Sequence, residues 1–412
     1  MNLFTLIIGY LRSRPLNTLL NIVLLSLGIA MITILLLFNN QLQEKISDNS
    51  KGIDLVVGAK GSPLQLILCN VFHVDFPTGN IKLNEADRLA KHRLVKHAIP
   101  VALGDSYQNY RIVGTTHAYA ELYKAELANG DWWVNDLEVT VGATVAKLLN
   151  LKLGDTFASA HGLSAEGHAH DEHPFVVKGI LKPTYSVLDN LILTNVASIW
   201  LVHEHSEEEA GVKPDSLNAS VLVSSALASD STREITSLLI KYRNPIAAIQ
   251  LPRYINSQTN MQAASPSFEA ARLFSILGVG IEALTGFAYV LIFISALSIF
   301  IALYNSLKER QYDLAIMRSM GASRGKLLWA TQLEGVALTL CGSVLGIVLG
   351  HTVLYLFTTL VTESRTAGVS AFVLYKEEWY LLAGSVVLGV ICSLIPSFQA
   401  YSTDIHKVLA KG

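Results

Sequence analysis

Long runs without charge alternate with a polar middle section along this chain. Asp, Glu, Lys and Arg are absent from four runs, at residues 15–43, 283–307, 335–362 and 379–403. About 20 apolar residues in a helix, at ~1.5 Å rise per residue, cross a hydrocarbon layer about 30 Å thick. The sequence therefore predicts four transmembrane helices, at residues 18–38, 281–304, 328–357 and 379–398.

The short segments beside these helices predict the orientation, because Lys and Arg concentrate on the cytoplasmic side of a membrane protein. Two arginines lie in residues 2–14, which have the pattern of an interfacial amphipathic helix. Five cations separate the second and third helices, and two lysines follow the fourth, whereas the loop at 358–378 has only two cations. We therefore expect both termini to be cytoplasmic and residues 39–280 to be extracytoplasmic.

Residues 39–280 have a mixed pattern, in which short apolar segments alternate with polar turns. This pattern predicts strands at residues 53–58, 110–114, 138–141, 175–181, 190–194 and 219–223, and helices at 84–92, 143–149 and 233–242. Residues 256–275 are polar to amphipathic, and we expect a stalk there. The predicted fold class is an α-helical membrane protein with four transmembrane helices and a large mixed α/β domain inserted between the first two.

Composition narrows the possible functions. Hydrophobic residues make up 51% of the chain and charged residues only 16%, so a purely soluble enzyme is not expected. The net charge of −2 gives no support for a nucleic-acid partner. The glycines at 58 and 61 lack the spacing of a phosphate-binding loop, and no G-x-S-x-G or H-E-x-x-H motif is present. We expect no catalytic site in this chain.

A short basic segment, KERQYDLAIMRSMGASRGK at residues 308–326, lies between the second and third predicted membrane helices. Apolar residues recur among its five cations, which predicts a short amphipathic helix that ends at Gly321. Such a helix can bury Ile316 and Met320 in a soluble partner while its charges fix the register.

The third predicted membrane helix contains three glycines at four-residue spacing, Gly342, Gly346 and Gly350. Small residues on one helical face allow a second helix to approach closely, from this chain or from another copy. Glu334, one turn into the same helix, is either a lock against the basic segment or the helix bundle, or an interfacial carboxylate. His351 and Glu282 are expected to be solvated.

Residues 161–173, HGLSAEGHAHDEH, hold four of the twelve histidines, and His203 and His205 lie further along. Imidazole with carboxylate suits zinc, so one interpretation is a metal site at His161, His168, His170 and His173. The other interpretation is a solvated loop in which the histidines have no role.

Three local patterns resemble the FtsX/MacB-type (FtsX-like) permease subunits of ABC transporters. Residues 309–324 fit E-R-x-x-x-x-A-I-M-R-S-M-G-A-S-R, which is similar to the cytoplasmic signature of that family. Residues 395–409, IPSFQAYSTDIHKVL, are similar to its closing motif. VGATVAKLLNLKLGDT at 141–156 and VKGILKPT at 177–184 are similar to its MacB-like periplasmic core domain.

The resemblance implies a permease that lacks an ATPase domain of its own. Two permease copies, or this chain and a paralogue, would bind a dimer of separate cytoplasmic ABC ATPase subunits, which use ATP and Mg; no cofactor would bind the permease directly. Membrane lipid and a periplasmic substrate or adaptor protein are further implied partners. The residues implied at the ATPase contact are Glu309, Arg310, Asp313, Ile316, Arg318, Met320, Gly321 and Arg324.

The resemblance also implies an address and a mechanism. The protein would be a multi-pass component of the bacterial inner membrane, with a periplasmic domain that moves during ATP hydrolysis (mechanotransmission). That movement would export, extract or release a periplasmic or outer-leaflet substrate. Two alternatives stay open from the sequence: zinc-linked transport through the histidine-rich loop, and a non-transporting regulator of a periplasmic hydrolase.

Overall fold

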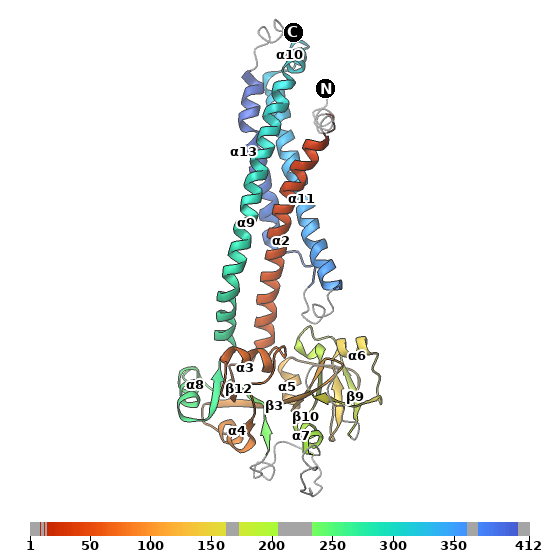
Figure 1. Ribbon diagram of the computed structural model, residues 1–412, viewed down its shortest axis with the longest axis vertical. Helices are drawn as coiled ribbons and strands as arrows, with labels where there is room; N and C mark the ends of the chain where they lie inside the picture. Colours follow the sequence, from red (N-terminus) through yellow and green to blue (C-terminus); the bar gives the residue numbers. More distant parts are fainter. Residues whose placement is uncertain are drawn as a thin grey trace. The chain divides into compact units, whose positions relative to one another are not determined.

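The computed structural model of the 412-residue chain describes residues 9, 12, 15–161, 173–204, 233–360 and 370–402. The chain separates into two compact units (Figure 1). The helical unit consists of Met1–Leu42 and Ile276–Gly412, and the α/β unit consists of Gln43–Ser275. The strand predicted at 219–223 lies outside the described residues, as does most of the interfacial helix predicted at 2–14.

Four long apolar helices are present among the described residues, which confirms the predicted number. They are α2 (Pro15–Ser50), α9 (Pro266–Glu309), α11 (Arg324–Leu360) and α13 (Lys376–Ser402). Each is longer than its predicted membrane span, and both α2 and α9 contain residues of both units. A fifth, short helix, α10 (Gln311–Ser319), connects α9 with α11.

Small residues lie at the contacts between the long helices. Gly28 of α2 lies against Ile292 of α9, and Gly389 of α13 lies against Thr339 of α11. Close backbone approach through small residues is how helices associate where lipid removes the hydrophobic drive. Larger apolar side chains from all four helices fill the centre of the bundle: Leu25, Ile29, Ile299, Leu303, Leu338 and Cys392.

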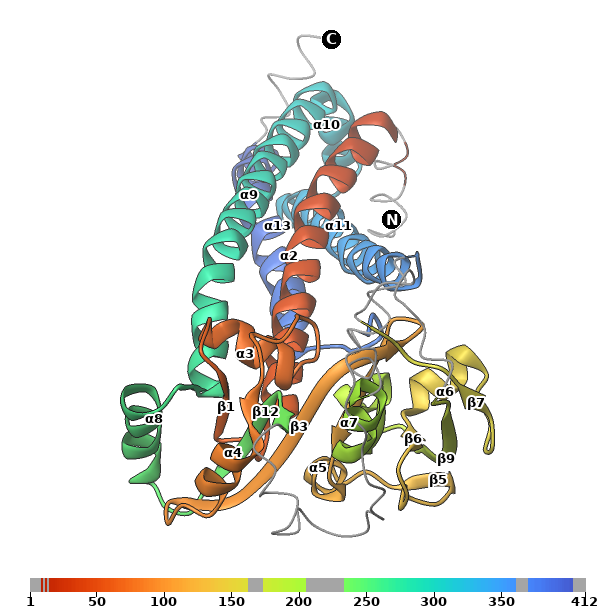
Figure 2. The same ribbon diagram turned by 60° about the horizontal axis from the view of Figure 1, so that its bottom comes forward.

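The α/β unit is built on one large mixed sheet. Its strands are β1 (Leu55–Ala59), β3 (Val95–Tyr107), β4 (Tyr110–Thr115), β5 (Leu127–Gly130), β6 (Glu138–Val141), β7 (Thr156–Phe157), β8 (Ala160–His161), β9 (Phe175–Leu181), β10 (Leu191–Asn195), β12 (Ser237–Tyr242) and β13 (Met261–Ala264). The main path is β13-β1-β12-β3-β4-β10-β6-β9-β5, with β7 paired to β9 and β8 to β3. A separate ribbon pairs β2 (Ile81–Lys82) with β11 (Glu234–Ile235). Figure 2 shows β3 as the long strand that crosses the unit.

Helices cover both faces of this sheet, because alternate strand residues point to opposite sides. Leu55 and Val57 belong to one buried cluster, which the helices α4 (Leu83–Ala90), α6 (Ala143–Leu149), α7 (Val196–Glu204) and α8 (Ala247–Gln258) complete. Val56 belongs to the other cluster, beneath α3 (Pro63–Asn70) and α5 (His117–Leu122). The unit therefore has two apolar cores, one on each side of the sheet.

Two predictions in this unit are wrong. Residues 233–242 form β11 and β12 instead of a helix, and β12 lies between β1 and β3 in the sheet. Residues 256–275 are not a simple stalk, because β13 pairs with β1 there before α9 begins. Both segments owe their conformation to sheet partners that are distant in the sequence. The strands predicted at 138–141 and 175–181 and the helix at 143–149 match β6, β9 and α6.

Candidate coupling site at one end of the helix bundle

Helix α10 lies at the end of the bundle where α2 begins and α13 ends (Figure 1). Its inner face packs on the bundle, with Leu314, Ala315 and Met317 buried. Leu314 and Met317 form one apolar cluster with side chains from the adjoining ends of α9, α11 and α13, namely Leu307, Leu327 and Ala400. The cluster fixes α10 to three of the long helices at once.

The outer face of α10 exposes apolar side chains. Tyr312 is 50% exposed, Ile316 is 36% exposed and Met320, just after the helix, is 73% exposed. The helix ends at Gly321, whose φ of +96° is a left-handed conformation that favours glycine. The Ala322 N–H donates to the Met317 carbonyl at 3.0 Å, which is the closing hydrogen bond expected of such a helix end. The predicted amphipathic helix is therefore present, with Ile316 and Met320 on its exposed side.

Charged side chains connect α10 to the bundle. Arg310 Nη1, just before α10, lies 3.6 Å from Glu334 Oε1 of α11, and both side chains are largely buried, at 13% and 10% exposure. The Arg324 guanidinium lies over the Tyr401 ring of α13 at 5.9 Å. The structure thus places Glu334 against the basic segment, and Arg310 faces the bundle rather than the surface.

The remaining predicted contact residues differ in accessibility. Glu309, Asp313, Gly321 and Arg324 are exposed, and Arg318 is half-buried. Ionic side chains at the rim of an apolar patch steer a partner and set its register. Met320 and Ile316 with Tyr312 form the apolar centre of this surface, and the exposed charges surround them. Tyr312 was absent from the predicted set, although its position four residues before Ile316 places it on the same helical face.

The three glycines of α11 contact α2 of the same chain. A Cβ on Gly342 would lie 2.9 Å from Leu25 Cδ2, and one on Gly350 would lie 2.9 Å from Thr33 Cβ. At Gly346 it would lie 2.7 Å from Ile29 Cβ and 2.8 Å from the carbonyl oxygen of Ser26. These distances are too short for any side chain, so α2 and α11 approach each other through glycine.

Replacing Gly346 with alanine is expected to push α2 away from α11. Such overpacking costs typically about 1–3 kcal/mol. Gly384 in α13 is the matched control, because a Cβ there would meet nothing within 4 Å. In detergent, the Gly346→Ala chain should unfold at a lower temperature than both the native chain and the Gly384→Ala chain. Equal midpoints for the two variants would show that the close approach at Gly346 is unimportant.

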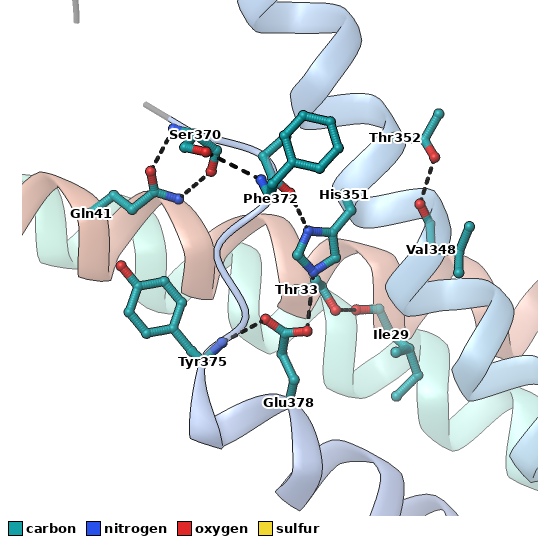
Figure 3. A network of polar contacts seen from close by, with 11 residues as sticks. Ile29, Thr33, Gln41, Val348, His351, Thr352, Ser370, Phe372, Tyr375 and Glu378 are labelled. Atoms are coloured by element: carbon teal, nitrogen blue, oxygen red, sulfur yellow. Dashed lines mark hydrogen bonds and ion pairs between the residues drawn. The ribbon is translucent and has the colours of Figure 1, made fainter. Parts of the chain in front are cut away.

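A polar network lies near the other end of α11 (Figure 3). His351 Nδ1 lies 2.5 Å from the Ala371 carbonyl oxygen and His351 Nε2 lies 3.1 Å from Glu378 Oε2, on α13. Since a carbonyl only accepts, Nδ1 carries a proton, so one further proton is shared between Nε2 and the carboxylate. His351 is therefore not simply solvated, as the sequence led us to expect, although Glu282 is exposed.

The same network reaches α2. The Gln41 side chain donates to the Ser370 carbonyl at 2.8 Å and accepts from the Ser370 N–H at 2.7 Å. Glu378 Oε1 accepts from the Tyr375 N–H at 3.1 Å. The connector at 370–375 is thereby tied to α2, α11 and α13, which stabilises this end of the bundle.

The predicted metal ligands lie only partly within the described residues. His168 and His170 are outside them. His161 is paired in β8, and His173 precedes β9. Among the side chains that are described, no group of three His, Cys, Asp or Glu is arranged to hold a metal ion.

Two family models match the sequence over most of its length. The model of the MacB-like periplasmic core domain matches residues 18–271, and that of the FtsX-like permease C-terminal region matches residues 285–405. The first match takes in the whole α/β unit, and the second takes in α10, α11 and α13. The chain belongs to the family of FtsX/MacB-type ABC transporter permeases.

Individual relatives are more distant. A segment of 103 residues is 33% identical to the uncharacterized ABC transporter permease YknZ of Bacillus subtilis (strain 168), and it spans 24% of this chain and 23% of that relative. The periplasmic region of MacB from Actinobacillus actinomycetemcomitans is 14% identical with a TM-score of 0.33, over 56% of this chain and 97% of that one. The extracellular domain of the noncanonic ABC-type transporter YknZ from Gram-positive bacteria is 12% identical with a TM-score of 0.29, over 52% and 99%.

Proposed function

We propose that this chain transmits ATP-driven motion from a separate cytoplasmic ATPase to its α/β unit. The observation that carries the proposal is the two-sided packing of α10. Its inner face is fixed to α9, α11 and α13 through Leu314 and Met317, while Ile316 and Met320 stay exposed. A partner that binds the exposed face therefore acts on three long helices together.

Helix α9 supplies a mechanical path for that motion. It runs without interruption from Pro266, directly after β13, to Glu309, directly before α10. At 1.5 Å per residue, its 44 residues extend over about 66 Å. Because a continuous helix is stiff along its axis, a displacement at the α10 end is carried to the residues that follow β13. Helix α2, which continues to Ser50, offers a second such path.

The proposed assembly follows the sequence-based orientation. Both termini and α10 face the cytoplasm of a bacterium, and the α/β unit lies in the periplasm. Two permease copies, or this chain and a paralogue, bind an ATPase dimer that supplies ATP and Mg chemistry. Movement of the α/β unit then exports, extracts or releases a periplasmic or outer-leaflet substrate.

Affinity purification from native membranes tests this assembly. The full chain with a small terminal tag should retain a soluble ABC ATPase, and the purified complex should hydrolyse ATP. Mass spectrometry of the retained proteins identifies the ATPase and any periplasmic partner. A preparation that retains a periplasmic hydrolase, and neither an ATPase nor ATP turnover, would contradict the proposal.

A further inference from the structure

A group of ionisable side chains lies within the α/β unit and takes no part in the coupling site. Asp105 of β3 has a fully buried side chain, at 0% exposure, and its Oδ1 lies 3.3 Å from Nε2 of His203. Its second oxygen, Oδ2, accepts a hydrogen bond from the Ser159 hydroxyl at 3.1 Å. Ser159 thereby orients the carboxylate so that Oδ1 faces the imidazole.

The separation of Oδ1 and Nε2 suits two ligands of one metal ion. Oxygen and nitrogen ligands bind zinc at about 2.0–2.1 Å in a tetrahedron, so any two of them lie about 3.3–3.4 Å apart. A direct N–H···O hydrogen bond is usually shorter, at about 2.7–3.2 Å. The 3.3 Å observed between Asp105 and His203 therefore matches the edge of a zinc tetrahedron.

The surroundings of His203 favour a cation. His203 lies in the last turn of α7, where the helix dipole is negative. Its side chain is 36% exposed, so an ion can reach Nε2 from solvent. Gly104 leaves the space that the ring occupies, because a Cβ there would lie 2.9 Å from Nε2.

The strand pairing brings the histidine-rich stretch to the same place. In the antiparallel pair of β3 and β8, Asp105 is the partner of His161. At the other end of the stretch, His173 lies two residues before Phe175, whose strand partner Phe157 lies two residues before Ser159. Asp105, His161 and His203 come from three segments that are far apart in the sequence.

We propose that Asp105 and His203, with His161 as a third ligand and water as a fourth, bind a divalent transition-metal ion of the zinc type. The described side chains supply two ligands, and His161 is assigned as the third on its register opposite Asp105. The ion is held on the sheet by a buried carboxylate, and His168 and His170 are not required. This site is independent of the coupling function proposed for α10.

Zinc titration of the full chain tests the proposal. The protein is purified in detergent with a tag that lacks histidine, stripped with a chelator and titrated with Zn²⁺ by calorimetry and with Co²⁺ by visible absorption. The native chain should bind one tightly held ion with a tetrahedral Co²⁺ spectrum. Asp105→Asn and His203→Gln should each weaken Zn²⁺ binding more than Ser159→Ala, whose orienting role predicts a loss of about 10- to 100-fold.

Two controls separate this site from other histidines. His97→Gln replaces an exposed histidine of the same strand, β3, and the double variant His168→Gln/His170→Gln changes the middle of the histidine-rich stretch. Both should bind Zn²⁺ as the native chain does. Binding that survives Asp105→Asn or His203→Gln, or that is lost only in the double variant, would overturn the proposal, as would the absence of any bound Zn²⁺. If Asp105→Asn does not fold, His203→Gln, at a partly exposed position, decides the question alone.

Discussion

Met320→Asp should leave the chain inserted in the membrane and abolish its productive contact with the ATPase. Met320 is 73% exposed in the chain and lies beside Ile316 on the outer face of α10. In the proposed complex, a carboxylate at this position is desolvated without a partner. Such an unpaired charge costs about 2–5 kcal/mol, which corresponds to a loss of roughly 30-fold or more in affinity. Ile316→Asp should act in the same direction.

Co-purification of the ATPase and ATP turnover by the purified complex measure this effect. The matched control is Leu374→Asp, which adds the same charge to an apolar residue that is 73% exposed in the 370–375 connector. The control should keep both the ATPase and its turnover. A Met320→Asp chain that retains the ATPase and hydrolyses ATP at the native rate would show that α10 is not the docking surface.

Breaking the Arg310–Glu334 pair should have the second large effect. Glu334→Gln removes the charge that faces Arg310 at 3.6 Å and leaves a guanidinium that is only 13% exposed without its partner on α11. Removing one member of a buried ion pair typically costs about 3–5 kcal/mol, whereas replacing both by apolar groups is often neutral. We therefore expect a lower unfolding temperature in detergent and weaker coupling of ATP turnover.

A double-mutant cycle tests whether the two residues act as a pair. Arg310→Met and Glu334→Met should each destabilise the chain, and the double variant should be more stable than either single one. The coupling free energy should be well above the 0.3–0.5 kcal/mol or so within which independent sites add. Strict additivity of the two substitutions would mean that the residues act separately.

The membrane helices could be predicted from the sequence because lipid requires long uncharged runs. The same runs do not reveal where a helix ends outside the bilayer, so α2 and α9 are longer than predicted. Residues 237–240, which are continuously buried in β12, illustrate the ambiguity of short apolar runs. Their periodicity fits helix as well as central strand, and their neighbours β1 and β3 decide between the two.

The coupling site was predicted well because it is contiguous in the sequence. Its apolar and charged residues all lie within one segment, and the helix stop at Gly321 is a local signal. The partner of Glu334 followed only from the structure, which chose Arg310 among five nearby cations. Neither the Glu378–His351 contact nor the Asp105–His203 contact had a signal of its own, because each depends on elements that meet only in the folded chain.

Movement of the α/β unit during ATP turnover is the central claim, and spin-label distances measure it directly. One label replaces exposed Lys152 of the α/β unit, and the other replaces exposed Glu377 of the helical unit, in a cysteine-free chain reconstituted with its ATPase. We expect the distance distribution to change between the nucleotide-free and ATP-trapped states, and this change to be absent in Met320→Asp. An unchanged distribution on ATP trapping, or the same change in Met320→Asp, would contradict transmission through α10.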